Sequence, residues 1–349
     1  MTNSNLYSKT FLLCIITIIY MHLYAYPGND DIQEWLEVIQ DTCVYDHNNH
    51  AAFTSLEEWK GNMYLAFREA GYHRATPTDK GKIRVLKGNE HEWELHNTFF
   101  KDGIDLRDPY ILKWKDRLLL YTTGYYSELT DDGWTELKPI KHNAPFVPSI
   151  WKIRVHNNVA YGIGNRVGYW PLLFKSEDGE TWEVINEFKL GGDATEADIV
   201  FDGDIMYICI RIDTPIGSNS MWGQSVFPFT ECRWSMMDVS VASPEMIKCS
   251  TNTFLLAGRE YDYHRKKGKD EIKVSLFVVD RGGHVMDRYI VQRQDGDQGY
   301  TSFCNIKGNK YYMSYYVGPQ NTAVRLLTFK VHEKKLKKNG NRRSKKNIR

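Results

Sequence analysis

Pairs of short apolar runs recur along the chain roughly every 50 residues, and this recurrence restricts the fold more than any other feature. In many pairs a turn centred on Gly, Asp or Asn separates the two runs, as at 201–204 and 306–310, which is the pattern of a β-hairpin. A period near ~40–50 residues with about four strands per unit is typical of β-propellers. Six such units fit residues 43–332, with pairs near 53–67, 104–122, 149–163, 195–210, 245–257 and 300–316. We therefore expect an all-β, six-bladed β-propeller, in preference to a long β-sandwich or a β-helix.

The first 25 residues have the layout of a secretory signal peptide. Lys9 supplies a positive charge, the apolar run Phe11–Tyr20 follows, and Ala25 is a small residue at a suitable cleavage point. The alternative is a single membrane anchor, but the run is short for a span, which needs about 20 residues. We predict cleavage near Ala25, no stable membrane span afterwards, and a secreted or periplasmic protein.

Two further segments flank the predicted propeller. Residues 26–42 are an N-terminal extension, in which 31–40 is expected to be one short helix because Trp35, Leu36 and Ile39 would share a face. Residues 333–349 are a basic tail, with nine Lys and Arg and no acid between 334 and 349. We expect this tail to be solvated and disordered.

The chain between these ends is acidic. Residues 27–333 carry 35 basic and 44 acidic side chains, a net charge of −9. Nucleic-acid binding needs clustered cations, so this balance argues against a nucleic-acid partner. Aromatic residues make up 13% of the chain, which suits β-structure and also clefts that bind sugars.

Cysteine spacing excludes two classes of small scaffold. The five cysteines after the signal segment are widely spread and form no C-x-x-C pair, which excludes a dense disulfide framework and a zinc knuckle. One or two disulfides are allowed in an oxidising compartment. His73 has no second His or carboxylate at ligand spacing, so we expect no metal site and no cofactor. The cysteines in question are Cys43, Cys209, Cys232, Cys249 and Cys304.

The sharpest local motif is Ser176–Trp182, which reads S-E-D-G-E-T-W. In such a turn the Asp side chain caps backbone N–H groups, the Gly takes a positive φ, and the Trp packs beneath. Weaker echoes stand at Lys87–Trp93 and Thr130–Trp134. The motif matches the Asp-box (BNR repeat), and over residues 43–332 the chain resembles a divergent member of the sialidase superfamily of six-bladed propellers.

The resemblance implies an exported glycoside hydrolase, similar to exo-α-sialidases, that acts on a terminal sugar which can be acidic. Sialidases place a Glu about 15 residues before an Arg on a central blade, and here Glu196 precedes Arg211. A later blade supplies Arg259, and Tyr300 stands in the Gly-Tyr-Thr that opens the last blade. The resemblance makes Tyr300 the nucleophile, Glu196 its base, and the two arginines ligands of a substrate carboxylate.

These residue types suit that chemistry. A phenol is a weak nucleophile until a neighbouring carboxylate draws off its proton, so Tyr300 should lie within hydrogen-bond reach of Glu196. A neutral Tyr suits an anionic sugar, which would repel a carboxylate nucleophile, and Arg offers a planar fork to a carboxylate.

The chain departs from the family at the first arginine. Sialidases carry it in F-R-I-P at the start of blade one, where this chain reads A-F-T-S-L at 52–56. Arg68 and His73 follow the next strand and could enter the cleft instead. Asp79 is the positional candidate for the acid/base residue, and Asp108, preceded by Arg107, is a second candidate.

Three alternatives stay open at this stage. A five-bladed arabinanase- or xylosidase-like glycosidase would use Asp108 and Glu196 and leave Tyr300 idle, because R-D-P-Y-I at 107–111 is a pattern common in that group. A non-catalytic carbohydrate-binding propeller would fit the missing first arginine. Glu196 could also simply pair with Arg211, with Tyr300 as one more core aromatic.

Overall fold

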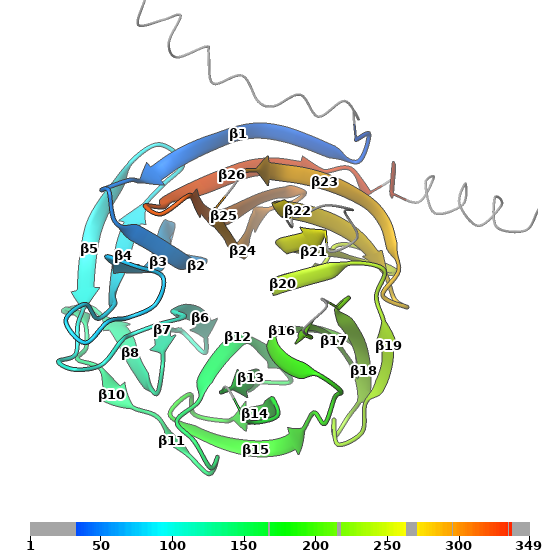
Figure 1. Ribbon diagram of the computed structural model, residues 1–349, viewed down its shortest axis with the longest axis horizontal. Helices are drawn as coiled ribbons and strands as arrows, with labels where there is room; N and C mark the ends of the chain where they lie inside the picture. Colours follow the sequence, from blue (N-terminus) through cyan, green and yellow to red (C-terminus); the bar gives the residue numbers. More distant parts are fainter. Residues whose placement is uncertain are drawn as a thin grey trace, which may run out of the picture. The chain divides into compact units, whose positions relative to one another are not determined.

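Six antiparallel sheets stand around a central axis in the computed structural model, which describes residues 33–166, 168–214, 218–262, 271–294, 296–333 and 335–336 (Figure 1). Each sheet contains one of the predicted strand pairs as the two strands at its inner edge. The six-bladed propeller is therefore confirmed, and the five-bladed alternative is wrong. None of the described helices is long and apolar enough to cross a membrane.

Blades one to three occupy residues 50–187. Blade one consists of β2 (His50–Trp59), β3 (Asn62–Ala70), β4 (Lys82–Gly88) and β5 (Trp93–Phe99). Blade two consists of β6 (Tyr110–Trp114), β7 (Arg117–Thr122), β8 (Tyr125–Thr130), β9 (Gly133–Trp134) and β10 (Lys138–Pro139). Blade three consists of β12 (Ser149–His156), β13 (Val159–Asn165), β14 (Leu172–Ser176) and β15 (Thr181–Glu187), with β11 (Lys141–His142) parallel to β15.

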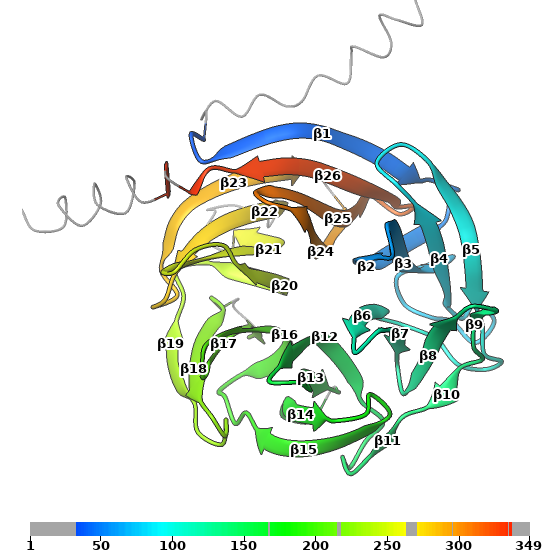
Figure 2. The same cartoon turned by 180° about the vertical axis from the view of Figure 1, so that it is seen from behind.

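Blades four to six complete the ring (Figure 2). Blade four consists of β16 (Asp193–Asp202), β17 (Ile205–Asp213), β18 (Met221–Val226) and β19 (Arg233–Met236). Blade five consists of β20 (Ser240–Lys248), β21 (Thr253–Asp262), β22 (Glu271–Asp280) and β23 (Val285–Arg293). Blade six consists of β24 (Asp297–Lys307), β25 (Lys310–Gly318), β26 (Ala323–Val331) and, from the other end of the chain, β1 (Leu36–Tyr45).

Strand β1 replaces the helix that the sequence predicts over 31–40, so that prediction is wrong for its described part. β1 pairs antiparallel with β26 from Leu36 opposite Val331 to Tyr45 opposite Val324. Trp35, placed on a helical face by the prediction, is fully buried just before the strand, whereas Ile39 is exposed. Pairing with a strand almost 300 residues away satisfies the backbone and overrides the local period. The propeller consequently begins at Leu36 rather than at 43.

The predicted tail also starts later than expected. Glu333, Lys335 and Leu336 are helical, and Leu336 is buried in the same apolar cluster as Trp35. The first apolar side chain of the tail is therefore part of the core. Residues 337–349 and the predicted signal segment 1–25 lie outside the described residues, so cleavage and export stay predictions.

The predicted turn at Ser176–Trp182 joins β14 to β15 and has the expected contacts. Asp178 Oδ1 accepts hydrogen bonds from the backbone N–H of Glu180 (2.8 Å) and of Thr181 (2.7 Å). Gly179 has a φ of +81°, and Trp182 is buried. The two weaker echoes, at 87–93 and 130–134, occupy the equivalent turns after the third strands of blades one and two. All five described cysteines are unpaired.

The innermost strands share a backbone irregularity that aims residues at the axis. The ladder to the second strand shifts register at 52–55, 151–154, 194–197, 242–245 and 299–302. Phe53, Lys152, Ser243 and Tyr300 all have a positive φ at these shifts. A β-bulge of this kind re-aims a side chain and leaves backbone groups out of the ladder.

One buried ionic group joins three inner strands. Arg154 Nη2 lies 2.7 Å from Asp198 Oδ2 and 3.0 Å from Glu245 Oε1, and Lys152 Nζ lies 2.7 Å from Glu245 Oε2. Burial raises the pKa of Asp198 to about 7 even though Arg154 lowers it. Arg154 and Lys152 together balance the charge of Asp198 and Glu245, and Arg154 is the cation that contacts both carboxylates.

We expect Arg154→Leu to lower the free energy of unfolding by about 3 kcal/mol or more, because it leaves Asp198 and Glu245 buried with too little positive charge. Urea unfolding measures the change. Lys113→Ala, which removes an exposed ion pair with Glu58, is the control and should cost at most about 1 kcal/mol. Equal effects of the two substitutions would contradict the structural role of Arg154.

Candidate active site

A cleft of about 620 Å³ lies where the inner strands converge, and it gathers five of the nine predicted site residues. These are Arg107, Asp108, Glu196, Arg211 and Tyr300, from blades two, four and six. The other four, Arg68, His73, Asp79 and Arg259, lie around it without forming its lining. Residues distant in sequence therefore meet at the axis, as the repeat pattern predicted.

The predicted contact between Tyr300 and Glu196 is present. The Tyr300 hydroxyl donates a hydrogen bond to Glu196 Oε1, across the ring from β24 to β16. Burial and the charge of Glu196 raise the pKa of Tyr300 well above its ordinary value, so the phenol is neutral in the resting site. A neutral phenol bonded to a carboxylate has a base in place to receive its proton.

Three partners hold the Glu196 carboxylate. Its Oε2 accepts hydrogen bonds from Arg211 Nη1 (3.1 Å) and from the backbone N–H of Ser243 (2.6 Å). Burial raises the pKa of Glu196, but Arg211 and the Tyr300 hydroxyl outweigh burial and leave that pKa below its ordinary value. The lowered pKa favours the ionised form of Glu196, and this carboxylate contacts both Arg211 and Tyr300.

Asp108 has the opposite character. It has a φ of +50° just before β6, its Oδ2 accepts a hydrogen bond from Ser149 Oγ (3.3 Å), and its buried Oδ1 has no hydrogen-bond partner among the described residues. Burial raises the pKa of Asp108 despite the nearby Arg107, and the negative charge of Glu196 raises it further. The cleft thus holds one carboxyl whose pKa is raised and one whose pKa is lowered, an arrangement that suits acid/base catalysis.

Asp79, the positional candidate for the acid, has a local role. Its Oδ2 accepts a hydrogen bond from the backbone N–H of Gly71 (2.9 Å), and its own backbone N–H donates to Thr76 Oγ1 (3.0 Å). These contacts order the loop after β3. Asp108 lines the cleft, whereas Asp79 does not.

Arg68 and Arg107 both contact Asp105, in different ways. Arg68 is fully buried and donates from Nε and Nη2 to Asp105 Oδ1 (3.0 and 2.8 Å). Arg107 lies with its guanidinium 4.6 Å from the centre of the Phe53 ring and lines the cleft. Phe53 stands in the stretch where sialidases carry their first arginine, so this chain has an aromatic face there and a cation above it.

Arg259 is engaged on every side that the structure describes. Its Nη2 donates to Asp297 Oδ1 (2.5 Å) and to the Tyr316 hydroxyl (2.7 Å), its Nη1 donates to the Tyr261 hydroxyl (3.1 Å), and its Nε donates to the carbonyl of Gln298. Asp297 also neutralises its charge. Arg259 therefore has a structural role near Tyr300, and its guanidinium lies 5.7 Å from the centre of that ring.

Asp297 also holds two histidines of blade one. Its Oδ2 lies 2.8 Å from His50 Nε2 and 2.5 Å from His73 Nδ1. Two imidazoles and one carboxylate at this spacing could indicate a metal site, which would contradict the sequence prediction that His73 binds no metal. Ligand atoms around a tetrahedral zinc are separated by about 3.3 Å, however, so these shorter separations are those of hydrogen bonds. Arg259 on the other carboxylate oxygen already supplies the positive charge.

The cleft also holds residues that sequence reasoning missed, among them Arg166, Thr195 and Asp213. Asp213 lies two residues after Arg211 on the same strand, so the two side chains share a face, and its Oδ1 accepts from Arg211 Nε at 2.8 Å. Arg166 directly follows β13, as Arg68 stands near the end of β3 and Arg211 near that of β17. The repeat therefore indicates an arginine near the end of the second strand of a blade, and Arg166 follows that pattern.

Comparison with models of protein families and with curated proteins found no match to the chain. Comparison with solved structures found matches. A protein of unknown function from Dyadobacter fermentans matches with a TM-score of 0.70 and 17% identity, over 86% of this chain and 100% of that one. Phage phi92 endosialidase matches with a TM-score of 0.58 and 9% identity, over 84% of this chain and 69% of that one.

Trypanosoma rangeli sialidase matches with a TM-score of 0.57 and 12% identity, over 80% of this chain but only 55% of its own length. The fold is that of the sialidases. At these identities the likeness establishes the six-bladed sialidase-like propeller and no more. This sialidase-like chain brings a Tyr–Glu pair to its axis, whereas the surrounding arginines take part in other contacts.

We expect Asp297→Asn to lower the free energy of unfolding by about 3 kcal/mol at pH 7, because Arg259 loses its buried countercharge. Burial raises the pKa of Asp297, but His50, His73 and Arg259 hold it well below its ordinary value. The carboxylate therefore stabilises the fold above the unfolded-state pKa of about 4, and this stabilisation is lost as the pH falls further.

Urea unfolding of both proteins over a pH series measures this difference. The gap between wild type and Asp297→Asn should narrow steadily below pH about 4. Asp204→Asn, at an exposed carboxylate, is the control and should show little difference at any pH. A gap that does not change with pH would mean that Asp297 stabilises the fold by shape rather than by charge.

Proposed function

We propose that this sialidase-like propeller is a glycoside hydrolase in which Tyr300 is the nucleophile, Glu196 its base and Asp108 the acid/base residue. The hydrogen bond from the Tyr300 hydroxyl to Glu196, across the axial cleft, is the observation that carries the proposal. A tyrosine that only filled the core would not require a hydrogen bond to a carboxylate that an arginine and a backbone N–H hold in place. The turn at Ser176–Trp182, which matches an Asp-box, supports the same superfamily.

The proposed reaction runs in two steps. Tyr300 Oη attacks the anomeric carbon while its proton passes to Glu196 Oε1, and Asp108 gives its proton to the departing glycosidic oxygen. Asp108, now ionised, takes a proton from water as that water attacks the anomeric carbon. The bond to Tyr300 breaks, and Glu196 returns the proton to the phenol. Both steps invert the anomeric carbon, so the product retains the starting configuration.

An acidic sugar is the substrate class that the cleft favours. The guanidinium groups of Arg107, Arg166 and Arg211 line the cleft, and Arg recognises carboxylates well. Trypanosoma rangeli sialidase has been solved with sialic acid and, with 2,3-difluorosialic acid, as a covalent intermediate. Because Arg259 is paired with Asp297 and Arg211 with Glu196 and Asp213, the acidic group of the substrate depends chiefly on Arg107 and Arg166.

We expect Tyr300→Phe to lower kcat by about 10³-fold or more, because the attacking oxygen is lost while the ring remains. Release of fluorescent alcohol from methylumbelliferyl sialosides, uronides and neutral glycosides measures it. Tyr311→Phe, a buried tyrosine of the same blade in the outer cluster, is the matched control and should retain activity. Absence of turnover by the wild-type protein on every glycoside, together with glycan binding, would favour a carbohydrate-binding propeller instead.

We expect Asp108→Asn to lower kcat/KM by about 10²- to 10⁴-fold for glycosides with poor leaving groups and far less for those with good ones. Only a poor leaving group needs the proton of Asp108. Wild-type kcat/KM should also fall as pH rises through the raised pKa of Asp108, since the acid must be protonated. Asp79→Asn should leave the leaving-group dependence unchanged, and the reverse pattern would assign the acid to Asp79.

A further inference from the structure

The loop between β3 and β4 contacts a cleft arginine through its backbone and has no role in the chemistry proposed above. The carbonyl of His73 accepts a hydrogen bond from Arg107 Nη1 at 2.9 Å. One residue earlier, the carbonyl of Tyr72 accepts a hydrogen bond from Arg68 Nη1 at 3.0 Å. Two consecutive carbonyls therefore bind the two arginines that also contact Asp105.

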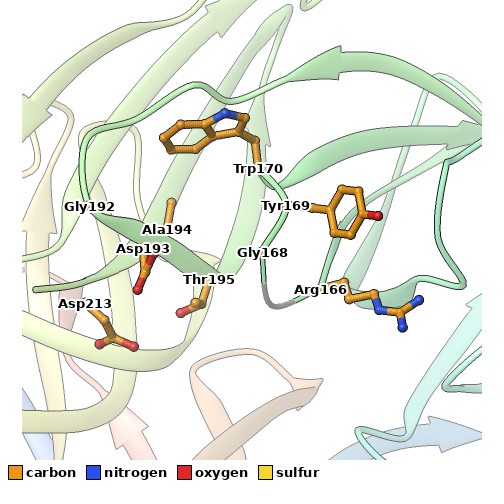
Figure 3. Close-up of a pocket in the computed structure, with 9 residues that line it drawn as sticks. All are labelled: Arg166, Gly168, Tyr169, Trp170, Gly192, Asp193, Ala194, Thr195 and Asp213. Atoms are coloured by element: carbon orange, nitrogen blue, oxygen red, sulfur yellow. The ribbon is translucent and has the colours of Figure 1, made fainter.

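The two arginines that would bind an acidic group of the substrate differ in how firmly they are held. Arg107 is bound by the His73 carbonyl and lies with its guanidinium 4.6 Å from the centre of the Phe53 ring. Figure 3 shows the side chain of Arg166 turned away from Asp213, and its guanidinium forms no ion pair with the residues that the structure describes. Arg107 is therefore the arginine that is oriented before a substrate binds, which lowers the cost of binding.

The side chain of His73 is held in turn by blade six. Its Nδ1 lies 2.5 Å from Oδ2 of Asp297, the first residue of β24, and it donates to that carboxylate. Arg259 and His50 bind the same carboxylate and fix its place. The His73 side chain is 39% exposed, so this hydrogen bond, rather than enclosure by other side chains, fixes the loop at this point.

His73 thus joins a fixed carboxylate on blade six to a cleft arginine that stands just before blade two. Because one residue carries both contacts, loss of the side-chain bond to Asp297 would release the carbonyl that orients Arg107. Among the described residues, the polar contact then left to the Arg107 guanidinium is the longer one to Asp105 Oδ2, at 3.4 Å.

We propose that His73 is a positioning residue: its hydrogen bond to Asp297 holds the carbonyl that aims Arg107 at the acidic group of the substrate. The inference rests on the proposed function and deepens it, because it names what orients the arginine on which acid recognition depends. His73, which the sequence analysis expected in the cleft as a substrate ligand, acts instead through Arg107.

Binding of acidic sugars tests this role without requiring turnover. The probes are N-acetylneuraminic acid and D-glucuronic acid, each compared with its methyl ester, which keeps the ring and removes the negative charge. Saturation-transfer NMR measures the dissociation constants. We expect wild type to bind at least one acid more tightly than its ester, and His73→Ala to lower this preference about tenfold.

Matched variants separate the hydrogen bond from a general effect on the loop. His73→Asn places an amide N–H near the position of Nδ1 and should keep the preference within about threefold of wild type, whereas His73→Gln places it near Nε2 and should lose as much as His73→Ala. Tyr72→Ala removes an exposed side chain of the same loop, retains the carbonyl, and should behave like wild type. No preference for either acid in wild type, no change in both His73→Ala and His73→Gln, or an equal loss in Tyr72→Ala would overturn the inference.

A double-mutant cycle shows whether His73 acts through Arg107. Arg107→Ala should itself lower the preference for the acid about tenfold or more. Adding His73→Ala to Arg107→Ala should then change the preference by less than about twofold, because the contact between the two residues is already lost. Additive effects of the two substitutions would mean that His73 acts on binding by another route, and the positioning role would be wrong.

Kinetics on methylumbelliferyl glycosides of the same acids separates this inference from the proposed function. For an acid that is hydrolysed, His73→Ala should raise KM about tenfold and change kcat by less than about threefold, since Tyr300 and Glu196 keep their hydrogen bond. A fall in kcat at unchanged KM would count against the positioning role. If acid preference depends on His73 but no glycoside is hydrolysed, the positioning of Arg107 stands and the hydrolase proposal fails. If glycosides are hydrolysed but His73→Ala changes neither KM nor the preference, the reverse holds.

Discussion

The pairing of β1 with β26 closes the ring of six sheets, and the contacts of the cleft depend on that closure. Blade six takes three strands from the end of the chain and its outermost strand from the beginning. Without β1, β26 would be an open edge with unpaired backbone groups. Tyr300 stands on the first strand of this same blade, and Glu196 stands on blade four, so their hydrogen bond exists only while the ring holds both blades at fixed positions.

Closure of the ring places polar backbone groups at the axis, and the bulges of the inner strands release some of these groups for other hydrogen bonds. At each bulge some backbone groups leave the ladder and need other partners. The N–H of Ser243 donates to Glu196, the carbonyl of Tyr300 accepts from Thr54, and that of Thr301 accepts from Lys152. The irregularity of the inner strand therefore also supplies a hydrogen-bond donor to Glu196, the proposed base. The same few residues therefore contribute to the stability of the fold and to the candidate site.

The charged side chains around the axis form ion pairs, but the arginines that line the cleft come from only one side of the ring, blades two to four. Arg259 is neutralised by Asp297, and Arg68 is bound by Asp105, so neither offers a free cation. Arg107, Arg166 and Arg211 line the cleft, and Arg211 is in turn paired with Glu196 and Asp213. In the proposed function, an acidic group of the substrate is therefore bound by Arg107 and Arg166 rather than at the position of the missing first arginine.

The sequence by itself determined the six hairpin units and the turn at 176–182, because each depends on neighbours within a few residues. It also indicated Tyr300, Glu196 and Arg211, since the resemblance rests on short motifs at strand ends. It did not reveal that residues 36–45 form a strand, because the partner strand lies almost 300 residues away. Only the tertiary structure decided that Asp108 rather than Asp79 lines the cleft, and that Asp297 binds Arg259, His50 and His73. The physical reason is that burial and countercharge depend on which side chains the closed ring brings within about 3 Å, and no local pattern encodes that distance.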